Sequence, residues 1–136
     1  MPHRVLAHTA DTGIEATADT LAELVRELAG GMFALISPLD PALARSWVTV
    51  GVEADTLPDL VVDILSELLY QSEVGDLVFC DFQVEMGSNL AVIVAAGGIP
   101  VSEVDAAGPP IKAVTYHDLV VEKRDNDWYG RVYFDV

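Results

Sequence analysis

The groups in this chain whose placement could support chemistry are carboxylates near its two ends. The sequence closes with Asp135-Val136, so a side-chain carboxylate and the terminal carboxylate are neighbours. Asp11 belongs to an opening segment, His8-Thr9-Ala10-Asp11-Thr12-Gly13. If Asp11 folds against Asp135, three carboxylates converge, and they repel one another unless a cation or a proton compensates them. Hard divalent cations such as Ca²⁺ or Mg²⁺ prefer oxygen ligands of this kind.

The same carboxylates have two other interpretations. Asp and Gly are typical of turns, because Asp bonds its own backbone and Gly adopts positive φ, so Asp11 and Gly13 by themselves favour a hairpin turn. Asp11 and Asp135 could also be catalytic, either as a paired general acid and base or as carboxylates of a small metal-dependent hydrolase. The sequence defines no substrate for such a pair.

A second polar segment, Ile111-Lys112-Ala113-Val114-Thr115-Tyr116-His117, lies late in the chain. His117 could be a general base, a metal ligand or a core histidine. The chain has no Gly-x-Ser-x-Gly, His-Glu-x-x-His or Gly-x-x-x-x-Gly-Lys motif. The pair Gly97-Gly98 is more typical of a turn than of a phosphate-binding loop. Because no nucleophile partner is visible, the sequence favours a protein that is not an enzyme.

Composition restricts the partners and the compartment. There are 22 acidic residues against seven basic ones, a net charge of −15. Such a chain repels nucleic-acid phosphates, so we expect no direct nucleic-acid binding. The charge either attracts a basic protein surface or serves general solubility. Cys80 is the only cysteine, which excludes an internal disulfide and a Cys/His zinc site. With no signal peptide and no long apolar run, we expect a cytoplasmic protein away from membranes.

Two helices would position these residues. The first begins at Thr20, where Glu23 completes a capping box, and ends at Ser37-Pro38. Gly30-Gly31 interrupts it and predicts either close packing or a bend. The second begins near Thr56, has an unbroken apolar stripe, and ends before Gly75. Its other face carries an acidic stripe that a basic partner or plain solvation would explain, formed by Asp59, Asp63 and Glu67.

Alternating or apolar runs predict strands between and after the helices. Two pairs of these strands are predicted to form hairpins, one with its turn at Gly87-Ser88-Asn89 and one with its turn at Asp125-Asn126-Asp127. In the last strand Phe134 faces the core, whereas Tyr133 and Asp135 face away from it. We therefore predict that residues 1–136 form one α+β domain, a two-layer sandwich of a largely antiparallel sheet with two main helices.

Taken together, these segments resemble the archease family over essentially the whole length. The resemblance rests on their order and spacing, and the matching segments are His8-Thr9-Ala10-Asp11-x-Gly13, Leu68-Leu69-Tyr70, Leu77-Val78-Phe79-Cys80-Asp81-Phe82, Ile111 to His117, and Phe134-Asp135-Val136. Thr12 is a mild departure, because an apolar residue is common there.

The resemblance implies an archease-like fold and an accessory role in tRNA splicing. Archeases activate the RNA ligase that joins a 2′,3′-cyclic-phosphate end to a 5′-hydroxyl end; they promote its metal-dependent guanylylation and multiple turnover without joining RNA themselves. It also implies that Asp11, Asp135 and the terminal carboxylate of Val136 bind a divalent metal, Ca²⁺ first, with Mg²⁺ or Mn²⁺ possible. Lys112 and His117 match a functional polar motif near that site. A general chaperone role would need an exposed apolar patch.

Overall fold

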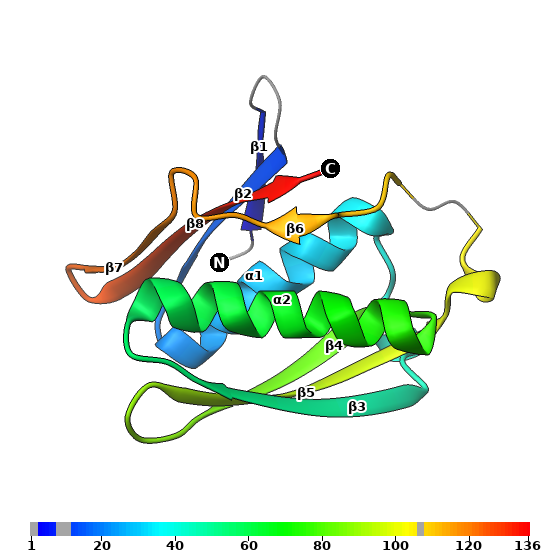
Figure 1. The fold of residues 1–136 in the computed structure, drawn as a ribbon, viewed down its shortest axis with the longest axis horizontal. Helices are drawn as coiled ribbons and strands as arrows, with labels where there is room; N and C mark the ends of the chain where they lie inside the picture. The colour runs from blue at the N-terminus through cyan, green and yellow to red at the C-terminus, as the bar shows by residue number, and fades with distance from the viewer. Residues whose placement is uncertain (1–2, 8–11, 106–107) are drawn as a thin grey trace.

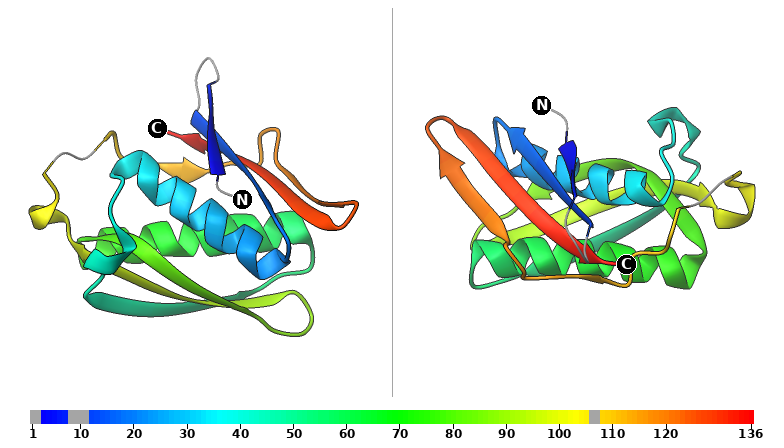
Figure 2. Two further views of the ribbon diagram at one scale, coloured as in Figure 1. Left: turned by 180° about the vertical axis from the view of Figure 1, so that it is seen from behind. Right: turned by 90° about the horizontal axis from the view of Figure 1, so that it is seen from above.

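The computed structural model describes residues 3–7, 12–105 and 108–136. Two helices lie between two antiparallel sheets (Figures 1 and 2). One sheet has five strands in the order β1-β2-β8-β6, with β7 also paired to β8, and the other has the order β3-β5-β4. The strands are β1 (His3–Ala7), β2 (Thr12–Ala18), β3 (Ser46–Glu53), β4 (Leu77–Met86), β5 (Ala91–Pro100), β6 (Ala113–Val114), β7 (Val120–Arg124) and β8 (Asp127–Asp135).

The helices begin where side-chain caps satisfy their first backbone N–H groups. Helix α1 (Leu21–Ile36) is capped by Thr20, whose hydroxyl accepts from the Glu23 N–H at 3.1 Å. Helix α2 (Leu57–Gly75) is capped by Thr56 in the same way, at 3.2 Å from the N–H of Asp59. Both starts agree with the sequence prediction.

The core fills the space between the sheets. It contains fully buried residues of both helices, among them Leu24, Leu28, Leu60 and Leu65. The Phe33 ring meets the Phe79 ring edge-on, with ring centroids 5.3 Å apart. Both sheets therefore bury their inner faces against one shared helical layer.

The glycine pair in α1 does not end or divide the helix. At Gly31 the His3 ring lies so close that a Cβ atom would be 2.7 Å from it, whereas a Cβ at Gly30 would meet nothing within 4 Å. Close packing against β1, rather than a bend, thus accounts for Gly31.

The α+β class, the two helices and the antiparallel pairing are confirmed, but three details differ from the sequence analysis. The strands divide into two sheets instead of joining into one. Gly97-Gly98 is wrong as a turn, because both residues lie inside β5. A Cβ at Gly98 would be 2.2 Å from the carbonyl oxygen of Val78, so this position needs glycine for close backbone approach. The short strand β6 was not predicted.

Charge is unevenly distributed over these elements. Helix α2 contains acidic residues at four positions and no basic residue. Four of the seven basic residues of the chain instead lie on β1, β7 and β8, and they are Arg4, Lys123, Arg124 and Arg131. Within the described ranges, no helix has the length and apolar character required to cross a membrane.

Candidate functional site

Thr12 and Gly13, the segment from Ile111 to His117 and the closing residues of the chain meet at one end of the five-stranded sheet. Strand β2 pairs with β8 so that Thr12 is opposite Phe134 and Gly13 is opposite Tyr133. On its other side β8 pairs with β6, where Ala113 is opposite Asp135. The register thus places the residue after Asp11 against the residue before Asp135.

Hydrogen bonds join the segment from Ile111 to His117 to the end of β8. The backbone N–H of Lys112 donates to the carbonyl oxygen of Asp135 at 2.7 Å. The Thr115 hydroxyl donates to the carbonyl oxygen of Tyr133 at 2.9 Å and accepts from the N–H of His117 at 3.3 Å. These hydrogen bonds therefore hold the segment against β8 and also stabilise the turn that follows Thr115.

Tyr133 is the side chain that joins the three segments. Its ring lies against Gly13, where a Cβ atom would be 2.6 Å from two ring carbons. The His117 ring meets the same ring at a centroid distance of 5.9 Å and an interplanar angle of 61°. Although the alternation of β8 places Tyr133 on the side away from the helices, it is only 7% exposed. Contacts with β2 and with the 115–118 turn bury it instead.

Gly13 is therefore not a turn residue. It lies in β2 between two paired strands, opposite Leu6 on β1 and Tyr133 on β8. Among the described glycines none has positive φ. The sequence argument from conformational freedom was wrong for Gly13, and the reason for glycine is the space that the Tyr133 ring occupies.

A hydrogen bond fixes the 115–118 turn to α2. The Tyr116 hydroxyl donates to a carboxylate oxygen of Asp59 at 2.6 Å. This bond, and then burial and the nearby charge of Asp59 and Asp63, raise the pKa of the phenol to about 12. One member of the acidic stripe thus has a structural partner within the chain.

The carboxylates predicted to bind metal are described in part. Asp135 ends β8 with its side chain exposed, and Val136 is 39% exposed. Asp11 and His8 lie outside the described residues. Within residues 3–7, 12–105 and 108–136, no three His, Cys, Asp or Glu side chains gather in a metal-binding group. Two adjacent carboxylates suit a hard cation in chemical type, and a three-carboxylate site requires Asp11 in addition.

Lys112 and His117 lie beside this end of the sheet in different ways. His117 is exposed, and its Nε2 is 3.3 Å from a carboxylate oxygen of Asp118. The exposed side chain of Lys112 lines two neighbouring cavities between α2 and the 110–114 segment. Backbone pairing therefore brings Lys112 to Asp135, whereas its side chain serves a different surface.

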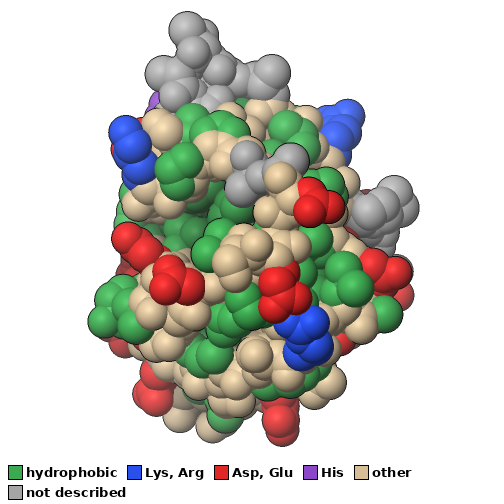
Figure 3. All heavy atoms as spheres, turned by 90° about the vertical axis from the view of Figure 1, so that its right-hand side faces the viewer, with side chains coloured by type: hydrophobic (Ala, Val, Ile, Leu, Met, Phe, Trp, Pro, Cys, Tyr) green, Lys and Arg blue, Asp and Glu red, His purple; other side chains and the backbone are tan. Residues whose placement is uncertain are grey.

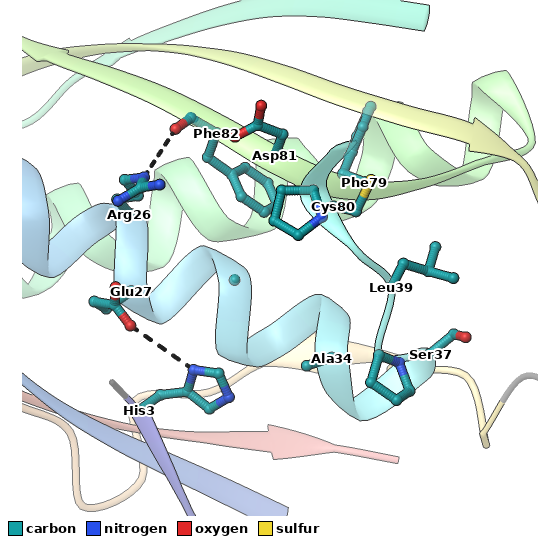
Figure 4. A pocket seen from close by; sticks show the side chains of 13 residues that line it. His3, Arg26, Glu27, Ala34, Ser37, Leu39, Phe79, Cys80, Asp81 and Phe82 are labelled. Carbon is teal, nitrogen blue, oxygen red and sulfur yellow. Dashed lines mark hydrogen bonds and ion pairs between the residues drawn. The ribbon is translucent and has the colours of Figure 1, made fainter. Parts of the chain in front are cut away.

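A separate cavity of about 400 Å³ lies between α1 and β4 (Figure 4). On one side Arg26 donates from Nε to the carbonyl oxygen of Phe82 at 3.2 Å. On the other, His3 Nδ1 is 3.9 Å from a carboxylate oxygen of Glu27. Arg26 and the acidic residues Glu27 and Asp81 thus line the cavity, so groups of both signs are present.

The β4 wall of this cavity is shaped by a bulge. Pairing with β5 shifts between Phe79 and Asp81, leaving Cys80 as the extra residue. Burial, and then the charges of Asp81 and Asp40, raise the pKa of the Cys80 thiol. The thiol therefore stays neutral near pH 7 and is a weak nucleophile there.

Comparison with known proteins settles the family. The model of the archease protein family (MTH1598/TM1083) matches residues 3–136. The chain belongs to the archease family. The protein archease of Methanopyrus kandleri is 31% identical over 140 residues, covering 100% of both chains. That of Methanosarcina acetivorans is 34% identical, covering 98% of this chain and 95% of its own.

Solved structures agree with the archease fold. The solution structure of Methanobacterium thermoautotrophicum protein 1598 has a TM-score of 0.78 at 23% identity, covering 98% of each chain. The crystal structure of a Thermotoga maritima archease, named a possible chaperone, has a TM-score of 0.69 at 19% identity, covering 96% of this chain and 94% of its own. The expected archease-like architecture is thus confirmed.

Sequence reasoning missed two residues of this archease site. Tyr133 was assigned to the outward face of β8, and the signal that could have found it is the glycine two positions after Asp11. Tyr116 is part of the motif from Ile111 to His117, but its contact with α2 was not predicted. The acidic stripe on α2 could have indicated a hydrogen-bond donor opposite it.

Proposed function

We propose that this archease is a non-enzymatic activator of the tRNA-splicing RNA ligase that joins 2′,3′-cyclic-phosphate and 5′-hydroxyl ends. In this proposal it promotes the metal-dependent guanylylation and the multiple turnover of the ligase. The observation that carries the proposal is family membership over residues 3–136, combined with the pairing of the three motif segments at one end of a sheet.

The proposed metal ligands are Asp11, Asp135 and the terminal carboxylate of Val136. Supporting them is the register, in which the sequence neighbours Thr12 and Phe134 are directly opposite. A divalent cation, Ca²⁺ or alternatively Mg²⁺ or Mn²⁺, would relieve the repulsion among these carboxylates. Lys112 and His117 would act beside the metal, Lys112 by fixing the backbone of Asp135 and His117 by holding Tyr133 in place.

The charge of the chain supports a protein partner over direct contact with RNA. A net charge of −15 opposes approach to phosphates and favours approach to a basic protein surface. The ligase binds nucleotide and RNA, both anionic, so we expect it to present such a surface. The activator would then act by contact with the ligase.

The test is a multiple-turnover ligation assay with the host's RNA ligase at substoichiometric concentration, GTP and divalent metal. Wild-type protein should stimulate turnover, and Asp135→Ala should not. Asp127→Ala is the matched control, because Asp127 is an exposed aspartate at the opposite end of the same strand. It should stimulate as well as wild type.

Two outcomes would count against the activator role, and a third would count against the role of the carboxylates in it. If wild type gives no stimulation, the family role does not extend to this chain. If the isolated protein hydrolyses phosphate esters with metal present, and Asp135→Ala abolishes that turnover, the same carboxylates serve a small metal-dependent hydrolase instead. Equal stimulation by Asp135→Ala and wild type would leave the activator role intact and remove the carboxylates from it.

A further inference from the structure

A groove runs along the C-terminal half of α2 and is not explained by the carboxylate site. It consists of two cavities of about 520 Å³ and about 230 Å³ that share Leu69, Glu73, Ile111 and Lys112. Because they share these residues, the cavities are neighbours along the edge between α2 and the 110–114 segment. Figure 3 views this end of the molecule, where hydrophobic side chains surround a hollow with acidic side chains beside it.

The larger cavity of the groove is lined mainly by apolar side chains, whereas the lining of the smaller cavity is more polar. Leu77, Val78 and Ile111 line the larger cavity, and Val101 at its edge is 43% exposed. Tyr70, which lines the smaller cavity, is 57% exposed. Apolar surface around a concavity is the kind of surface that monomeric proteins use for binding.

The electrostatics of the groove favour a cation. Glu73 and Asp76 are exposed and line it. The last turn of α2 contains no basic residue, so the negative end of the helix dipole adds to these carboxylates. Lys112 is the basic residue among the lining side chains, and no ion pair within 4.0 Å joins it to Glu73 in the described structure.

We propose that this groove binds a segment of a partner protein in which an apolar side chain is flanked by lysine or arginine. The apolar side chain would fill the larger cavity, and the basic groups would approach Glu73 and Asp76. Nucleic acids and anionic lipid surfaces carry the wrong sign for such a groove. A basic and apolar polypeptide complements both its shape and its charge.

The groove lies next to the carboxylate end of β8. Lys112 lines both cavities, and its backbone N–H is bonded to the carbonyl oxygen of Asp135. A partner segment seated in the groove would therefore bring the rest of the partner close to Asp135 and Val136. That this partner is the RNA ligase rests on the proposed function.

The binding test uses short synthetic peptides, so that it does not depend on the ligase. A peptide alternating leucine with arginine is titrated into ¹⁵N-labelled protein and followed by NMR. Peptides alternating leucine with glutamate, or serine with arginine, test whether both properties are required. The leucine–arginine peptide should bind most tightly and should shift the amide signals of Leu69, Glu73, Leu77 and Ile111.

Charge and apolar contact are tested by paired variants. Glu73→Lys should weaken binding of the leucine–arginine peptide by about tenfold, whereas Glu85→Lys, the same charge change at an exposed residue of β4, should weaken it less than about twofold. Val101→Ser should weaken it by about fivefold, and Ile93→Ser, at a 51% exposed apolar position on β5, should not. Equal effects within either pair, or equal binding of the serine–arginine peptide, would overturn the proposal.

The ligase assay separates this proposal from the proposed function. At limiting protein concentration Glu73→Lys should stimulate ligation less than Glu85→Lys does. If both variants stimulate equally, the groove is not the surface that meets the ligase, although activation stands. If wild type gives no stimulation while the peptides behave as expected, the groove stands and its partner is another basic protein.

Discussion

Replacing Gly13 by alanine tests the contact that joins the three motif segments. The new methyl group would lie 2.6 Å from two carbons of the Tyr133 ring, whereas ordinary contacts are 3.4–4 Å. The ring must therefore retreat by about 1 Å, and its movement is also restricted by its contact with the His117 ring. Overpacking of this kind typically lowers the free energy of unfolding by about 1–3 kcal/mol. We expect Tm to fall by roughly 4 °C for each kcal/mol, measured by circular dichroism.

Gly51→Ala is the matched control for this experiment. Gly51 is also a strand glycine, but a Cβ there would be 3.6 Å from its nearest neighbours, an ordinary contact. It should change stability by less than about 0.5 kcal/mol. In a double-mutant cycle, Tyr133→Leu should remove more than half of the Gly13→Ala effect. If Gly13→Ala and Gly51→Ala are equally tolerated, the ring does not lie over Gly13 as described.

Three further predictions concern stability. Gly30→Ala should stabilise the protein by up to about 1 kcal/mol in urea unfolding, because no atom obstructs a methyl group there; a loss would contradict the open space. The pKa of Tyr116 is raised to about 12, first by its hydrogen bond to Asp59. The hydroxyl therefore contributes fully to the free energy of unfolding below pH 10, and this contribution is lost as the pH rises towards 12. Unfolding measured against pH should show this loss in wild type but not in Tyr116→Phe. The pKa of Glu15 is lowered from 4.5, first by the Tyr129 hydroxyl, so its contribution is present above pH 4.5 and is lost in acid; Tyr129→Phe should show a smaller acid loss than wild type.

Local patterns in the sequence predicted the helices well. Thr20 and Thr56 are capping residues whose effect extends over three positions, and the apolar stripes that follow have an unambiguous period. The turn of the β4–β5 hairpin was likewise predicted from Gly87, whose N–H bonds to the carbonyl oxygen of Ala91 at 2.8 Å. Such features depend on neighbours in sequence, so one chain suffices to find them.

Contacts between distant segments were harder to predict. Strand β6 has two residues, and it exists because Ala113 and Val114 pair with the end of β8, at least twenty positions later. Gly13 and Gly98 were assigned to turns because sequence cannot show the ring or backbone that approaches them. The resemblance to archeases supplied Asp135 and Asp11 as site residues, and physical reasoning alone left their role open between a ligand, a turn and an acid–base pair.

The uneven placement of charge gives the molecule an electric dipole as well as a net charge. Helix α2 has acidic residues and no compensating base, whereas most of the basic residues are on β1, β7 and β8. In the field of a positively charged partner, the acidic residues of α2 favour approaches in which α2 faces that partner. Productive collisions are then enriched over random orientation, and this enrichment is lost as salt shortens the range of the field to about 10 Å at 0.1 M.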